Sequence, residues 1–322
     1  MNSIPFLRLP FLVIQNMLSM MCPLELINLA KVCKRTKRIV KAIVDTQLSK
    51  KYHVDVYISE NYGTAIKNGK NSWYYMYTSR RIPTNYLLTE QTVLGSTIVF
   101  LQNFTLNKLD DFQRICDLCH DLFGDFKGID INMDNTDNQL IIDYLKSKQE
   151  SFEECEVCSV SERGHDIKHF LETLKITRNM SISAQISEDI NINLPENVEN
   201  SIFIQHSKFI KLEQFLALKS KQISLNSTNF TNQDIKSILK SWMASGSHLN
   251  LERLRIAFNS ATTEYILQNI PIEDGDEFQM DARLVELKYA PRGPDIRRED
   301  GKKARVILWR QANRSILDMF IH

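Results

Sequence analysis

The sequence contains little glycine and little proline, 10 and 8 residues among 322. The glycine-rich patterns GxGxxG and GxxxxGKS/T, which bring backbone N–H groups against phosphates, are absent from it. The hydrolase pattern GxSxG and the zinc-protease pattern HExxH are absent as well. These absences weigh against the common nucleotide-dependent and hydrolytic enzymes. We therefore predict a protein that is not an enzyme and carries no cofactor.

Long apolar runs and an excess of charge are also missing. No stretch of 18 apolar residues occurs, and Lys+Arg 40 against Asp+Glu 39 leaves a net charge of +1. The apolar segment from Ile4 to Leu18 resembles a signal peptide, but Pro10 and Gln15-Asn16 interrupt it and no basic residue precedes Arg8. We expect no membrane partner, a cytoplasmic or nuclear location, and reduced thiols at the six cysteines.

The first 51 residues differ from the rest of the chain in charge. They hold nine basic and two acidic residues, a net of +7, whereas the remainder sums to −6. Such a break indicates a separate module. The basic run from Lys34 to Arg38 could contact nucleic acid, but its charges alternate with apolar residues at helical spacing. We favour a solvated helix face over a nucleic-acid partner.

Three short helices are predicted in this module. They cover residues 11–21, 23–32 and 32–44, with Pro10 and Pro23 at positions that suit a helix start. The first carries an apolar stripe at 13, 14, 17, 18 and 21. Three such helices enclose a very small core. We therefore expect a partner or the following domain to cover an apolar face of the module.

The apolar positions of this module follow a known pattern. Together they resemble an F-box over about 35 positions, in the form found in the large nematode F-box family. The sequence departs from the common pattern at Leu12, where an acidic residue often stands, and at Thr36, where Trp is usual. A helical cap on a larger domain is the alternative. The residues that carry the resemblance are Leu9-Pro10, Val13, Met17-Leu18, Pro23-Leu24, Ile27, Leu29-Ala30 and Val32-Cys33-Lys34-Arg35.

After residue 52 the periodicity changes to that of strands, and then to alternating strands and helices. Successive strands lie about 20–30 residues apart, a spacing that overlaps the range of leucine-rich repeats. Strands are predicted at 53–59, 72–78, 97–102, 129–133, 154–160, 181–185, 201–205, 223–225 and 251–258. Helices are predicted at 110–123, 138–148, 165–174, 212–218, 231–242 and 262–269.

The unit from Ile223 to Phe258 shows the logic of these predictions. Thr231 and Asp234 form a capping pair, and Ile235, Ile238, Leu239 and Trp242 make the buried stripe of the following helix. The segment 225–258 resembles the second type of F-box-associated domain, and so does the closing segment 295–320. Asp300-Gly301 between alternating segments predicts a β-hairpin.

Two Cys-x-x-Cys pairs, Cys116/Cys119 and Cys155/Cys158, suggest a zinc site as a competing hypothesis. The pairs lie too far apart for a zinc ribbon, and the first falls on the apolar stripe of a predicted helix. Buried free cysteines are the interpretation we favour. The pair His165 and His169 is interpreted as the start of a helix.

The predicted fold is α/β. A small N-terminal three-helix F-box is followed by a degenerate leucine-rich-repeat-like strand–helix domain that ends in a C-terminal β-hairpin. We place the F-box at residues 4–51, a mixed linking region at 52–125 and the F-box-associated domain at 126–322.

The resemblance implies a function. The chain would be the substrate-recognition subunit of an SCF-type ubiquitin ligase, in which the F-box binds the SKP adaptor and through it cullin. The C-terminal domain would recruit a protein target. The alternative is a ligase-independent interaction module. The expected adaptor contacts are Leu9, Pro10, Val13, Met17, Leu18, Leu24, Ile27, Leu29, Val32 and Cys33.

Overall fold

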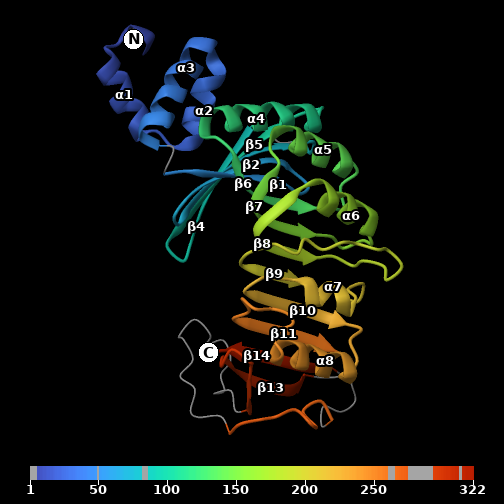
Figure 1. The fold of residues 1–322 in the computed structure, drawn as a ribbon. Helices are drawn as coiled ribbons and strands as arrows, with labels where there is room; N and C mark the ends of the chain where they lie inside the picture. Colours follow the sequence, from blue (N-terminus) through green and yellow to red (C-terminus); the bar gives the residue numbers. More distant parts are fainter. Residues whose placement is uncertain (1–5, 49–50, 82–85, 260–264, 275–292, 312–313) are drawn as a thin grey trace. The chain divides into compact units, whose positions relative to one another are not determined.

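The computed structural model describes residues 6–48, 51–81, 86–259, 265–274, 293–311 and 314–322 (Figure 1). It divides into two compact units, Met1–Phe152 and Glu153–His322. Both combine helices with a β-sheet, so the predicted α/β class is confirmed. The division after Phe152 does not show where the F-box or the linking region ends. The domain boundaries predicted at residues 51 and 125 therefore stay a prediction.

Three short helices open the first unit, as predicted. They begin after Pro10, at Pro23 and after Cys33, where the chain bends out of helical geometry. Their bounds are α1 (Phe11–Met20), α2 (Pro23–Val32) and α3 (Lys34–Ile43), with the short turns η1 (Phe6–Arg8) before and η2 (Val44–Leu48) after them.

A mixed β-sheet forms the rest of the first unit. Its strand order is β6-β1-β2-β3-β5-β4, in which β1 pairs with β6 and β3 with β5 in parallel, and the other neighbours are antiparallel. The strands are β1 (His53–Ile58), β2 (Tyr62–Asn68), β3 (Asn71–Thr78), β4 (Tyr86–Val93), β5 (Ser96–Phe104) and β6 (Phe126–Asn132), and the helices are α4 (Lys108–Phe123) and α5 (Asn138–Lys148).

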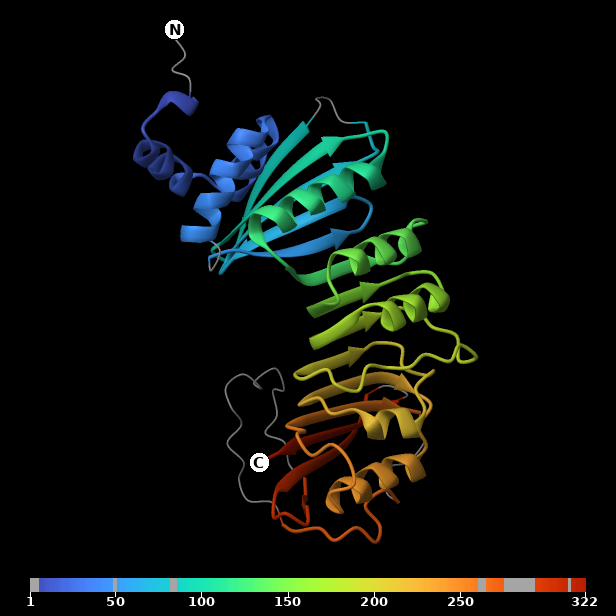
Figure 2. The same ribbon diagram turned by 45° about the horizontal axis from the view of Figure 1, so that its top comes forward.

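Helices α4 and α2 cover the same face of this sheet (Figure 2). Cys119 of α4 lies against Thr64 of β2, with Sγ 3.3 Å from Oγ1. Lys31 of α2 donates from Nζ to the Tyr75 hydroxyl of β3 at 2.7 Å. Thr64 and Tyr75 are directly paired across the strands, so both helices lie on one side.

The second unit repeats strands and helices along the chain. Its strand order is β7-β8-β9-β10-β11-β14-β13-β12, and β8 to β11 run parallel to one another. Helices α6, α7 and α8 lie on one side of the sheet (Figures 1 and 2). The elements are β7 (Ser151–Cys158), α6 (Gly164–Thr173), β8 (Lys175–Ser183), β9 (Ser201–Ile204), α7 (Leu212–Ala217), β10 (Gln222–Thr228), α8 (Asn232–Met243), β11 (Arg253–Phe258), β12 (Asp295–Arg297), β13 (Lys303–Gln311) and β14 (Arg314–Ile321).

Three side-chain hydrogen bonds join the unit that begins with β8 to the unit of β9 and α7 at one spacing. Ser220 donates to the carbonyl of Val198 at 2.5 Å across 22 residues. The same spacing of 22 residues separates the partners in two further bonds, Gln214 to Ile192 at 2.7 Å and Ser201 to Asn179 at 2.9 Å. The three bonds share one spacing because one unit stacks on the next. This supports the prediction of a repeat-like domain.

The predicted capping pair and hairpin are present. Thr231 Oγ1 accepts from the Asp234 N–H at 3.2 Å, and Asp234 Oδ2 accepts from the Thr231 N–H at 2.8 Å. The Asp300-Gly301 turn joins β12 to β13, and Gly301 has φ 91°, a value that favours glycine.

One predicted helix is wrong in its described part. Residues 262–269 were expected to continue the strand–helix rhythm. The positions 262–264 lie outside the described residues, and 265–269 form turns and a bend. The alternation of parallel strands and helices ends after β11, because the next strand beside β11 in the sheet is the antiparallel strand β14. No helix within the described ranges is long and apolar enough to cross a membrane.

Candidate protein-interaction surface

The α2–α3 junction is fixed by the side chain of Thr36. Its hydroxyl accepts from the Cys33 N–H at 3.1 Å and donates to the Cys33 carbonyl at 2.8 Å. Thr36 is buried although its position in the F-box pattern usually carries Trp. The Thr36 hydroxyl therefore caps the backbone of Cys33, the residue that precedes α3.

The three helices enclose a compact aliphatic core. Leu18 of α1, Leu26 and Ile27 of α2, and Val40 and Ile43 of α3 are all buried. Complete burial of one such side chain stabilises a fold by about 1.5–3 kcal/mol. The core thus contains few residues, but the side chains named here are almost completely shielded from solvent.

Helix α1 also exposes apolar side chains on its outer face. Leu12 is 71% exposed, Val13 42% and Met20 79%. Val13 and Met20 are seven residues apart, two helical turns, so they lie nearly in line along the helix, and Leu12 lies about a quarter turn away from them. Ile14 and Leu18 face the opposite way into the core. Exposed apolar side chains of this kind make the outer side of α1 a candidate for binding a partner.

The predicted adaptor residues fall into three groups in this structure. Pro10, Val13, Val32 and Cys33 are exposed, and Leu9, Met17 and Leu29 are half-buried. Leu18, Leu24 and Ile27 are buried. The three buried residues pack inside the helices, whereas the other seven expose side-chain surface that a partner can contact. Their role in adaptor binding stays a prediction.

Sequence reasoning missed two exposed members of the outer face, Leu12 and Met20. On the helix surface Leu12 lies among the polar side chains of Gln15, Asn16 and Ser19, so the period of the apolar residues does not mark it as a member of an apolar face. The spacing of seven residues between Val13 and Met20 was the available signal.

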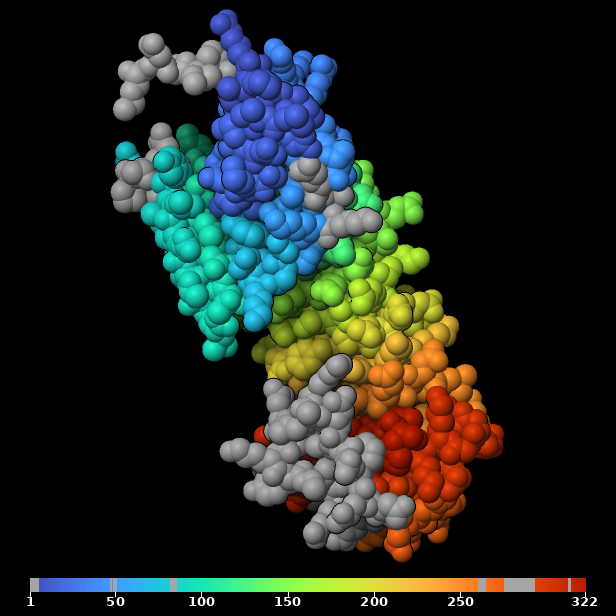
Figure 3. Space-filling model, turned by 90° about the vertical axis from the view of Figure 1, so that its left-hand side faces the viewer, coloured from blue at the N-terminus to red at the C-terminus, as the bar shows by residue number. Residues whose placement is uncertain are grey.

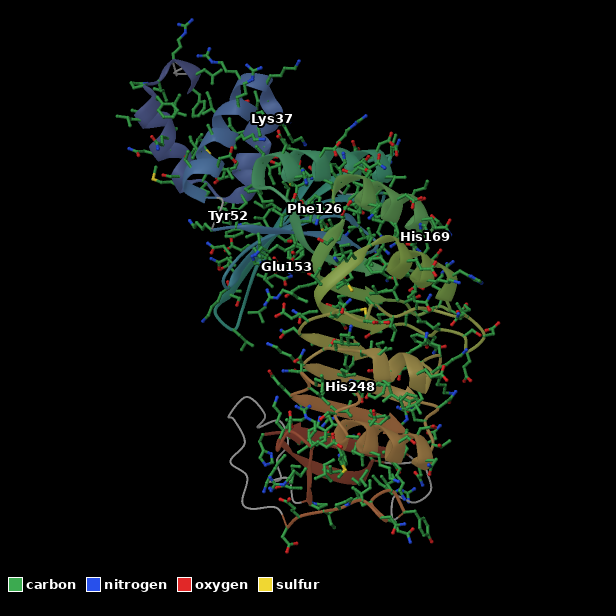
Figure 4. The ribbon with its side chains drawn as sticks, in the orientation of Figure 1. Lys37, Tyr52, Phe126, Glu153, His169 and His248 are labelled. Carbon is green, nitrogen blue, oxygen red and sulfur yellow. The ribbon has the colours of Figure 1, made fainter. Side chains whose placement is uncertain are left out.

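The basic run on α3 is partly paired within the chain. Lys37 and Lys41 both reach Asp121 of α4, at 2.8 and 2.5 Å (Figure 4 labels Lys37). Hydrogen bonds from these two lysines lower the pKa of Asp121. Lys37 of the basic run, together with Lys41 further along α3, therefore links α3 to α4.

The cysteines of the two Cys-x-x-Cys pairs behave as core residues. Cys116, Cys119 and Cys155 are buried, and burial raises the pKa of each thiol above its usual value. Cys158 is half-buried on the other face of β7. Within the described part of the chain, no group of three or more His, Cys, Asp or Glu side chains is placed to hold a metal ion.

The segment from β9 to β11 is held by buried aromatic side chains. Trp242 of α8 lies under the Arg298 guanidinium, which is 5.2 Å from the ring centroid. His248 packs on Phe215 of α7 with ring centroids 4.6 Å apart, and its Nδ1 lies 3.0 Å from the Leu218 carbonyl oxygen. Burial lowers the pKa of His248 to about 4. These groups stabilise the segment, and none forms a catalytic arrangement with another.

Two family models match the chain. Residues 6–44 match the model of the F-box domain, which spans α1 to α3, and residues 189–256 match the model described as F-box associated, which spans β9 to most of β11. No curated protein and no solved structure matches the chain.

Proposed function

We propose that this chain, an F-box protein that also carries an F-box-associated segment, is the substrate-recognition subunit of an SCF-type ubiquitin ligase. F-box domains typically bind an SKP-type adaptor and through it cullin. The observation that best supports the proposal is the exposed apolar face of α1, Leu12, Val13 and Met20, on the matched F-box.

The proposed activity is non-catalytic. The F-box fixes the chain to the adaptor, and another surface holds a target protein close to the ubiquitin-charged enzyme. Tethering raises the effective concentration of the target, commonly to the millimolar range for short flexible connections. No group of this chain needs to take part in bond making under this proposal.

We assign the adaptor contact to the exposed and half-buried residues of the F-box. Association buries Leu12, Val13 and Met20, which removes apolar surface from water at no cost to the inner core. Leu18 and Ile27 act indirectly, because they hold α1 and α2 in position.

A titration with purified SKP-type adaptor tests the assignment. Leu12→Asp with Val13→Asp places two carboxylates in the apolar contact, and we expect affinity to fall at least ~100-fold, since each lost aliphatic contact is worth ~1.5–3 kcal/mol. The matched control is Leu94→Asp with Leu106→Asp, two leucines that are exposed outside the F-box. The control should bind like the wild type.

Two results would count against the proposal. Failure of the folded wild-type chain to bind any SKP-type adaptor would leave a ligase-independent interaction module. Equal binding by the α1 variant and the wild type would show that the contact lies elsewhere.

A further inference from the structure

One row of paired residues crosses the sheet of the first unit and shows which part of it is covered. On this face Thr64 pairs with Tyr75, Tyr75 with Leu101, and Leu101 with Leu88. Helix α4 lies over Thr64 and α2 lies over Tyr75. Leu88, at the end of the row on β4, is 59% exposed. The helical cover therefore stops before β4.

A groove of about 750 Å³ occupies the face beyond α2. Its walls are the start of α2 and the facing side chains of β3, β5 and β4, and apolar groups such as Leu24, Trp73 and Leu88 line it. Figure 3 shows β4 and β5, in teal, as a band beside the dark blue helices of the F-box. The groove is large enough to receive side chains of another molecule.

Strand β4 is the edge of this sheet. It pairs with β5, and no strand among the described residues pairs with its outer side. All eight of its residues are exposed, including Leu87 and Leu88. Edge strands with apolar side chains accept a further strand from another chain, because their outer N–H and C=O groups need partners.

The charge of the groove restricts the partner. Glu25 and Glu90 line it, and the lining includes no Lys, Arg or His. Glu25 accepts from the Cys22 N–H at 2.7 Å, while Glu90 forms no ion pair within the described part of the chain. Leu88 and Glu90 project from the same face of β4, two residues apart.

We propose that β4 binds an extended segment of a target protein that adds a strand to its outer edge. The segment carries an apolar residue opposite Leu88 and a Lys or Arg two positions away, opposite Glu90. Main-chain hydrogen bonds supply the pairing, and the two side chains supply the selectivity. The inference deepens the proposed function, because it gives the chemistry of the target.

Selection of random heptapeptides displayed on phage against the full-length chain tests the side-chain rule. We expect enrichment of peptides with an apolar and a basic residue two positions apart. Glu90→Lys should weaken the selected peptides about tenfold and, in a new selection, favour acidic residues at the basic position. Gln91→Lys is the matched control, because Gln91 lies on the other face of β4.

Leu88→Asp should abolish binding of the same peptides, while Leu94→Asp, in the turn after β4, should not. Peptides that bind Glu90→Lys or Leu88→Asp as well as the wild type would overturn the proposal. A lack of enrichment would do the same. So would a dimer of the chain that Leu88→Asp dissolves, since the outer edge of β4 would then pair with a second copy of the chain.

Methylated peptides test the strand pairing. In an extended peptide alternate N–H groups point to one side. N-methylation of one alternate set should abolish binding, and methylation of the other set should leave it unchanged. Equal tolerance of both sets would exclude an added strand. These assays contain no adaptor, so they separate failure of this inference from failure of adaptor binding.

Discussion

At the scale of a residue, the burial of His248 links stability to pH. The neutral imidazole lies between the Phe215 ring and the Leu218 carbonyl, and its pKa of about 4 is below that of an exposed histidine. Between pH 6.5 and pH 4 the unfolded chain takes up a proton that the folded chain does not. Stability must therefore decrease as the pH falls through this window.

We predict that His248→Asn removes this dependence. Asn tolerates the positive φ of 53° at this position. Between pH 7 and pH 4.5 the wild type should lose about 2–3 kcal/mol more than the variant, measured by urea unfolding followed by tryptophan fluorescence. His165→Asn, at an exposed position, should keep the wild-type profile. An unchanged slope in His248→Asn would contradict the assignment.

At the scale of an element, α1 uses its two apolar faces differently. Its inner face closes the three-helix core through Leu18, which is fully buried. Its outer face leaves Leu12 exposed. The same residue type thus serves stability on one side and association on the other.

Leucine-to-alanine changes on the two faces should separate these roles. Leu18→Ala creates a cavity and should lower the free energy of unfolding by about 2–5 kcal/mol. Leu12→Ala should change it by less than about 0.5 kcal/mol, because most of that side chain is exposed to solvent. Denaturant unfolding of the two full-length variants gives both values. A large loss in Leu12→Ala would mean that the outer face is also structural.

The elements that the sequence predicted best have one clear period. Helices α5 and α8 and strand β1 were predicted nearly residue for residue. Their apolar residues recur about every 3.6 positions in the helices and every 2 positions in the strand. Strands β2 and β4 were missed for opposite reasons. Residues Tyr62–Asn68 of β2 are buried on both faces at first, and Tyr86–Val93 of β4 are exposed throughout, so neither strand alternates.

The same limit applies to the candidate sites. The F-box could be predicted because its contacts are local in sequence. The groove beside β4 could not, since it depends on the parallel pairing of β3 with β5 and on α2 lying over Tyr75. Such pairings are set by tertiary packing, which no local pattern specifies.

At the scale of the molecule, one buried carboxylate joins three strands of the second unit. Asp318 of β14 accepts from Arg255 of β11, at 2.7 and 3.1 Å, and from the Trp309 indole of β13 at 2.8 Å. Its side chain is 1% exposed. The charge is compensated by these three donors, which span the change from parallel to antiparallel pairing.

We predict that Asp318→Leu destabilises the chain by about 2–4 kcal/mol, because the Arg255 guanidinium loses its partner in a mostly buried site. The double variant Arg255→Leu with Asp318→Leu should recover part of this loss. Urea unfolding of the four proteins of the cycle gives the coupling energy. Additive losses would show that the pair does not act as a unit.

The place of β14 between β11 and β13 also has a consequence for synthesis on the ribosome. Strand β11 ends at Phe258, and its neighbour begins only at Arg314. At typical translation rates the roughly 55 intervening residues take about 3–11 s to be made. During that time one side of β11 has no partner strand, so the nascent chain exposes an adhesive edge that chaperones would need to shield.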